Sequence, residues 1–114
     1  MVLFSFFINR KAVIFVAERN GRILGFIELY LRQDEPNPAK ATYRYAFIQS
    51  LMVKQSERAG GIGTQLMQTA HQWATKHGAD EARLDVWEFD TGPLPFYEKL
   101  GYETLRRQLV HKLK

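Results

Sequence analysis

The sequence predicts an α/β protein of the α+β kind, in which helices pack on a mixed, largely antiparallel sheet. Two observations carry this prediction: strand-like runs follow one another through short turns in the N-terminal half, and a strand–helix–strand succession comes next. Strands joined by short turns pair antiparallel, whereas a helical crossover joins parallel strands. The chain has 114 residues and no cysteine. We therefore expect one domain over residues 1–114, without disulfides.

The N-terminal half contains three of the strand-like segments. Residues 1–8 are apolar, but they are too short to span a membrane and lack the basic start of a signal peptide, so we expect a buried or edge strand. Residues 12–17 and 23–31 are rich in β-branched and aromatic side chains. Asn20-Gly21 lies between them and predicts a hairpin, because both central residues of that turn need a positive φ.

Residues 43–53 predict a central strand, because apolar residues occupy both of its faces. Strict alternation would place Gln49 and Leu51 on one face, and Ile48 and Met52 on the other. The loop before this strand contains two prolines between residues 33 and 38.

The remaining elements follow from periodicity and from helix-end signals. A helix is predicted over 62–77, where apolar residues recur at helical spacing and Gly78 follows as a stop. We then expect a strand over 82–89, a short helix over 93–100 and a last strand over 105–113.

The segment that carries chemistry is a glycine-rich turn between the central strand and the first helix, Arg58-Ala59-Gly60-Gly61-Ile62-Gly63-Thr64. Such a turn presents unpaired backbone N–H groups and the positive end of a helix dipole to an anion. The lysine and hydroxyl residue of a Walker P-loop are absent, and the third glycine of a dinucleotide fingerprint falls on Leu66. These observations indicate either a phosphate site of another kind or a plain glycine-rich turn between a strand and a helix.

Arg58-x-x-Gly61-x-Gly63 after a strand resembles the Gln/Arg-x-x-Gly-x-Gly/Ala motif of the GNAT superfamily of N-acetyltransferases. Residues 84–90 are similar to a later strand of that family, and Phe96-Tyr97-Glu98-Lys99-Leu100-Gly101-Tyr102 is similar to its Phe-Tyr-x-x-x-Gly-Phe/Tyr helix end. The resemblance covers about residues 12–110. The family's first strand and two helices have no counterpart, so we expect a form shortened at the N-terminus.

The resemblance implies a GNAT-like fold with a central strand–helix–strand unit that binds acetyl-CoA as co-substrate, and no metal. The backbone of the central strand would pair with the pantetheine arm, an N–H near Met52 would stabilise the oxyanion, and the turn would hold the pyrophosphate. Tyr97 would protonate the departing thiolate. The implied cofactor-binding residues are Leu51, Met52, Val53, Arg58, Ala59, Gly60, Gly61, Ile62, Gly63, Thr64, Asp90 and Tyr97.

The general base is left open by the resemblance. Many family members carry a carboxylate where this chain has Gln49, and an amine with a pKa near 10 must lose a proton to react. The candidates are Glu28, which we favour, Asp85, Glu88 or a chain of water molecules. The implied catalytic residues are therefore Tyr97 and Glu28. Asp90 stands where the family commonly has Asn, which implies an altered contact with the cofactor.

The first hypothesis for function is an N-acetyltransferase that moves an acetyl group to a primary amine by direct attack in a ternary complex. The alternative is a non-catalytic CoA-binding module with a degenerate acceptor site. A nucleic-acid binder rests only on a formal charge of +4 and on aromatic residues, so we expect neither a nucleic-acid nor a membrane partner. We expect a cytoplasmic protein. An apolar edge strand tends to be covered, which suggests a homodimer.

Overall fold

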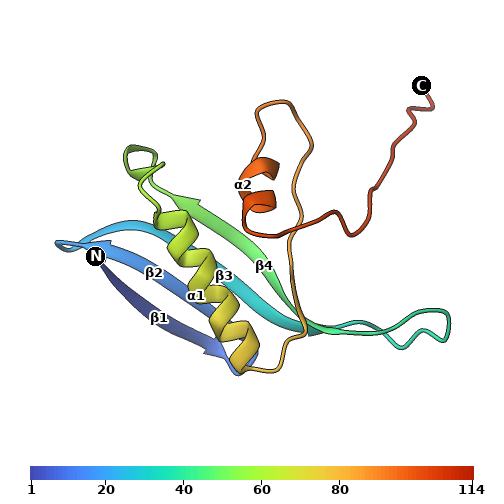
Figure 1. Cartoon of the computed structure of the whole chain (residues 1–114), viewed down its shortest axis with the longest axis horizontal. Coiled ribbons are helices and arrows are strands. Elements are labelled where there is room, and N and C mark those ends of the chain that lie inside the picture. Colours follow the sequence, from blue (N-terminus) through green and yellow to red (C-terminus); the bar gives the residue numbers. More distant parts are fainter. The chain divides into compact units, whose positions relative to one another are not determined.

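The computed structural model describes all 114 residues and divides into two compact units, Met1–Leu84 and Asp85–Lys114. The N-terminal unit contains a five-stranded sheet and a long helix, and the C-terminal unit contains a short helix (Figure 1). Each unit is described by itself. That residues 1–114 form one domain stays a prediction.

The strands of the N-terminal unit follow chain order across the sheet. They are β1 (Val2–Asn9), β2 (Ala12–Arg19), β3 (Arg22–Gln33), β4 (Arg44–Val53) and β5 (Glu81–Arg83). The first four pair antiparallel, and β5 pairs parallel with β4. A single turn of 3-10 helix, η1 (Gln55–Glu57), and the helix α1 (Ile62–Lys76) connect β4 to β5. The mixed, largely antiparallel sheet predicted from the sequence is confirmed.

The turn between β2 and β3 forms as its sequence predicts, with φ of 52° at Asn20 and 77° at Gly21. β1 lies at the edge of the sheet, where it pairs only with β2. The apolar N-terminal run is therefore an edge strand, one of the two forms expected for it.

The core lies between α1 and one face of the sheet, as the helix crossing the strands in Figure 1 indicates. Its buried residues are Val13, Ala17, Leu24, Ile27, Leu29, Ala46, Ile48, Ile62, Leu66, Met67, Ala70, Trp73 and Ala74, whereas Ala12 is buried on the other face, across the ladder from Tyr30. The helical members of this set recur at the spacing that predicted α1, because that spacing gathers them on one stripe. No helix in the structure combines the length and apolar character needed to cross a membrane.

A β-bulge in β4 interrupts the alternation predicted for that strand. Glu28 of β3 pairs with Ser50 and the next residue of β3 pairs with Ile48, so Gln49 is left without a partner across the ladder. A bulge shifts the pattern of faces by one residue. As a result, Ile48 and Leu51 share the face that carries α1, although strict alternation placed them on opposite faces.

Two predicted strands differ from the structure. The strand expected over 82–89 covers only Glu81–Arg83, because its pairing with β4 ends after three residues. No strand forms over 105–113, where Leu105, Leu109 and Leu113 are exposed. These three leucines would share one face of a strand, but Arg107 and His111 interrupt that face, and the segment pairs with no strand of the sheet. The C-terminal helix α2 (Leu94–Lys99) lies within its expected range.

Candidate active site

The edge of β4 that faces away from β3 has no strand partner over its last six residues. β5 pairs with β4 only through Tyr45, Ala46 and Phe47, so within the N-terminal unit the edge is open from Ile48 to Val53. An open edge presents backbone N–H and C=O groups that an extended ligand can pair with.

The hydrogen-bond alternation of β4 identifies which groups lie on that open edge. The Lys54 N–H donates to the Leu24 carbonyl on the β3 side at 2.8 Å. In an antiparallel pair the direction alternates from residue to residue, so the N–H and C=O of Met52 also face β3. The N–H groups of Leu51 and Val53, on either side of Met52, face the open edge. The N–H expected near Met52 is therefore best assigned to these two neighbours.

Arg58 connects the end of this edge to the turn that follows. Its Nε donates to the Val53 carbonyl oxygen at 3.1 Å, which fixes the guanidinium beside the last residue of β4. That bond uses one of the five N–H donors of a guanidinium. The side chain is exposed, so its remaining donors can reach a negatively charged ligand.

The turn before α1 presents backbone N–H groups without acceptors in the helix. The backbone has positive φ at Ala59 (67°) and at Gly61 (85°), which is the N-cap and provides no side-chain cap. The first backbone bond of α1 is donated by Gln65 to the Gly61 carbonyl at 3.0 Å. The N–H groups that precede it in the helix therefore have no acceptor inside it. This cluster of donors at the positive end of a helix fits a diphosphate.

Glu28 lies on the sheet face opposite α1. Its neighbours Ile27 and Leu29 are buried on the α1 face, and alternation places Glu28 on the other face with Ser50 across the ladder. The Tyr30 hydroxyl donates a hydrogen bond to Oε2 of Glu28. That bond raises the pKa of Tyr30. Glu28 thus occupies the strand next to the open edge, while Gln49 in the bulge is exposed.

An ion-pair cluster holds the start of β4 and β5 together. Arg83 donates to Asp34 at 2.8 Å and to Glu81 at 2.7 Å, and its guanidinium lies 4.0 Å from the centre of the Tyr45 ring. The hydrogen bonds from Arg83 lower the pKa of Asp34 to about 2. The cluster ties the loop after β3 to the point where the β4–β5 pairing ends.

Tyr97 lies on α2 in the C-terminal unit, where its ring packs edge-to-face against Phe96 and Tyr102, with ring centroids 5.1 and 5.8 Å apart. Burial raises the pKa of Tyr97, so the phenol is neutral and able to donate a proton at neutral pH. Its placement against the cofactor stays a prediction.

The acidic candidates of the C-terminal unit, Asp85, Glu88 and Asp90, are exposed. Glu88 forms an exposed ion pair with Arg107 at 3.3 Å. Trp87 is 86% exposed.

Sequence reasoning missed a pocket that lies beside the turn. Its lining residues are Arg19, Asn20, Arg22, Leu24 and Glu57, and its volume is about 330 Å³. The two arginines flank the Asn-Gly turn in the sequence, but only the fold brings Glu57 to them.

Comparison with known proteins identifies relatives over nearly the whole chain. Residues 2–102 match the profile of the Acetyltransferase (GNAT) family. The chain is 30% identical over 96 residues to the uncharacterized N-acetyltransferase YhfO of Bacillus subtilis, covering 83% of this chain and 61% of that protein. It is 26% identical over 98 residues to an aminoglycoside N(6')-acetyltransferase of Salmonella typhimurium, covering 86% and 67%. The chain thus spans about three fifths to two thirds of the length of these relatives.

Solved structures share the fold. A Bacillus halodurans protein superposes with a TM-score of 0.86 at 23% identity, over 94% of this chain and 69% of that one. The aminoglycoside N-acetyltransferase AAC(6')-Iy, solved with a bisubstrate analog, superposes with a TM-score of 0.78 at 24% identity, over 93% and 71%.

Proposed function

Because the chain belongs to the GNAT family of acetyltransferases, we propose that it transfers the acetyl group of acetyl-CoA to a primary amine. The observation that carries this proposal is the continuous surface made by the open edge of β4, Arg58 and the uncapped N–H groups at the start of α1. This surface offers strand-like pairing at one end and anion binding at the other. A pantetheine arm joined to a pyrophosphate has the same order of groups.

Each part of the cofactor has a proposed partner in the N-terminal unit. The amide groups of the pantetheine arm pair with the open-edge groups of Leu51 and Val53, as an added strand would. The N–H groups of residues 58–64 hold the pyrophosphate, together with the Arg58 guanidinium. The acetyl thioester then lies toward the bulge in β4.

The reaction is a direct acyl transfer. The amine nitrogen attacks the thioester carbonyl carbon, a C–N bond forms, and the carbonyl oxygen becomes an oxyanion that accepts a hydrogen bond from an open-edge N–H of β4. Removing one such donor costs about 3–4 kcal/mol of transition-state stabilisation. Collapse of the intermediate breaks the C–S bond and gives a thiolate, which takes the proton of the Tyr97 hydroxyl. A positioned general acid contributes about 10²–10⁴-fold to the rate.

Glu28 is the proposed acceptor for the amine proton. It lies on the sheet face that carries Ser50, one strand from the open edge, and a proton can reach it directly or through water. Asp85, Glu88 or water molecules alone are the alternatives. The amine itself is proposed only by class: two relatives are named aminoglycoside N(6')-acetyltransferases, so aminoglycosides are the first acceptors to test. A cytoplasmic location and a homodimer also remain proposals.

The test has two stages, since cofactor binding and acetyl transfer can fail separately. Acetyl-CoA is first titrated calorimetrically into the wild-type chain, the Arg58→Ala variant and, as a control, Arg10→Ala in the exposed turn between β1 and β2. We expect micromolar binding that Arg58→Ala weakens and Arg10→Ala preserves. Absence of binding at millimolar acetyl-CoA would contradict the proposal.

An amine panel with detection of released CoA thiol forms the second stage. Turnover with any amine excludes the second candidate, a CoA-binding module without activity. That candidate is favoured by Gln49, which is exposed in the bulge and cannot accept a proton at neutral pH. Binding of acetyl-CoA without turnover across aminoglycosides, amino sugars, polyamines and peptides would favour it.

A further inference from the structure

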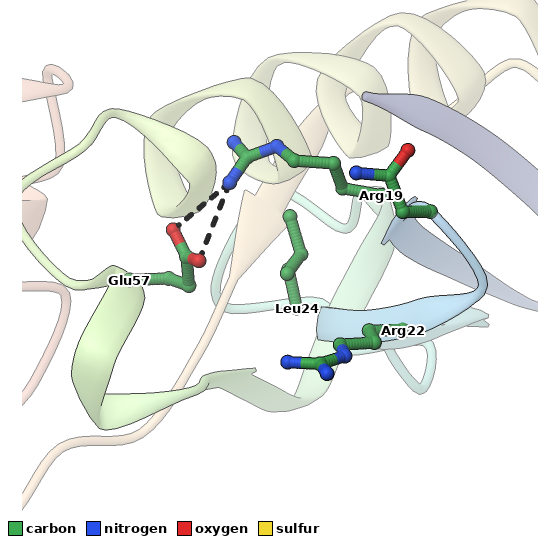
Figure 2. Close-up of a pocket in the computed structure, with 5 residues that line it drawn as sticks. Arg19, Arg22, Leu24 and Glu57 are labelled. Carbon is green, nitrogen blue, oxygen red and sulfur yellow. Dashed lines mark hydrogen bonds and ion pairs between the residues drawn. The ribbon is translucent and has the colours of Figure 1, made fainter.

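The pocket beside the glycine-rich turn is built from two arginines and one glutamate. Figure 2 shows the side chains of Arg19 and Arg22 on either side of Leu24, both extending toward Glu57. Arg19 is the last residue of β2 and Arg22 the first of β3, and the two residues pair across the tight turn, so their side chains start from neighbouring backbone positions. Leu24 is buried and forms the apolar floor between them.

The charges in this pocket do not balance. Nη1 of Arg19 lies 3.3 Å from both carboxylate oxygens of Glu57, whereas Arg22 forms no ion pair and is exposed. Two guanidinium groups therefore face one carboxylate. The side chains of Arg19 and Glu57 are 48% and 28% exposed, so their ion pair is weak and another anion can compete for Arg19.

The pocket adjoins the turn that we assign to the pyrophosphate. Glu57 ends η1 and directly precedes Arg58, and the Leu24 carbonyl accepts the Lys54 N–H at 2.8 Å. A ligand bound at the turn can therefore reach the pocket. CoA carries a phosphomonoester on its ribose, one sugar ring away from its pyrophosphate, and a guanidinium fork matches the oxygens of such a group.

We propose that Arg19 and Arg22 bind the ribose 3′-phosphate of CoA, which gives the chain its preference for CoA over 3′-dephospho-CoA. The inference rests on the proposed function, since it assumes that the turn holds the pyrophosphate. A phosphate group on the acceptor, or free phosphate, has the same chemistry, and the experiment separates these sources.

The experiment measures the ratio of two dissociation constants. Acetyl-CoA and 3′-dephospho-acetyl-CoA are titrated into the wild-type chain, Arg22→Gln and Arg19→Gln, with Arg10→Gln as a control that removes the same charge outside this pocket. Charge-assisted bonds predict that the wild type prefers acetyl-CoA by about tenfold or more. Arg22→Gln should reduce this ratio to less than about threefold by weakening acetyl-CoA alone, and Arg10→Gln should leave it unchanged.

Several outcomes overturn the inference. If the wild type binds both compounds with equal affinity, or if Arg22→Gln weakens the binding of both by the same factor, the pocket does not bind the 3′-phosphate. The proposed function stands in either case. If Arg22→Gln weakens the binding of inorganic phosphate or of a phosphorylated amino sugar but leaves the affinity for both CoA compounds unchanged, the pocket binds a different phosphate group. If neither CoA compound binds the wild type, the proposed function itself fails. Thermal melting verifies that each variant folds, and we expect little change in Tm because the substituted arginines are exposed.

Discussion

Gly25 of β3 leaves no room for a side chain against the backbone of β4, and it offers a sharp test of the open edge. A Cβ on Gly25 would lie 2.5 Å from the Met52 carbonyl oxygen and 3.2 Å from the Val53 Cα. Both are backbone atoms, so no side-chain rotation can relieve the contact. Ordinary contacts begin at 3.4 Å, and β4 must therefore move by about 0.9 Å to accept alanine.

That displacement has a cost in stability and a cost in binding. Overpacking of this kind typically costs about 1–3 kcal/mol, which corresponds to a fall in Tm of about 4–12 °C for a domain of this size. The Met52 carbonyl and the Val53 N–H belong to one planar peptide group, so moving the first also moves the second. Loss of well-aligned pairing at the open edge should weaken acetyl-CoA about tenfold.

The assay combines thermal denaturation with a calorimetric titration of acetyl-CoA, and Gly78→Ala is the matched control. Gly78 has a φ of 84° and follows the C-terminal end of α1, with only Arg44 near its missing Cβ. The strain of alanine there costs about 1 kcal/mol, about 22 Å along α1 from the turn. We expect Gly78→Ala to lose stability without losing affinity. A Gly25→Ala variant with unchanged Tm and unchanged affinity would refute the reasoning.

Three further predictions concern chemistry, pH and packing. Tyr97→Phe removes the proposed acid and should lower kcat at least tenfold with little change in acetyl-CoA affinity, measured by thiol release; an unchanged rate removes Tyr97 from this role. Because the pKa of Asp34 is lowered to about 2, its ion pair with Arg83 stabilises the fold above about pH 4, and this stabilisation is lost as the pH falls toward about 2. The Tm of Asp34→Asn should therefore depend less on pH in that range than the Tm of the wild type. If the two pH profiles coincide, the ion pair contributes nothing to stability. Met67→Ala opens a cavity in a fully buried position and should cost about 2–5 kcal/mol in chemical denaturation, and a loss below about 1 kcal/mol would show that the core collapses around it.

Local chemistry explains which parts of the fold could be predicted. The Asn20-Gly21 hairpin and the helix over residues 62–77 depend on turn preferences and on periodicity, which lie within short windows of sequence, and both are confirmed. The prediction of a last strand over residues 105–113 was wrong, because a strand needs a neighbouring strand to pair with and periodicity alone does not show whether one is present. The bulge at Gln49 depends on the register between β3 and β4, which no single strand encodes.

In the candidate site, too, some parts could be predicted from short stretches of sequence and others could not. The turn at residues 58–64 could be found from its glycines, and its open N–H groups follow from helix geometry. The choice of Leu51 and Val53 over Met52 required the hydrogen bond from Lys54, because alternation along a strand does not reveal which edge each residue faces. The arginine pocket brings together Arg19 and Glu57, which are 38 positions apart in the sequence, and no local sequence pattern predicts such a contact.

The open edge of β4 also affects how the protein behaves in a concentrated solution. Unpaired N–H and C=O groups along six residues can accept a strand from another copy as readily as a pantetheine arm, so the ligand-free chain is prone to self-association at this edge. A cofactor that occupies the edge removes that template and stabilises the folded state by about 2.7 kcal/mol at a concentration one hundred times its dissociation constant. If acetyl-CoA binds there as proposed, the solubility of the chain should rise with the concentration of acetyl-CoA during purification.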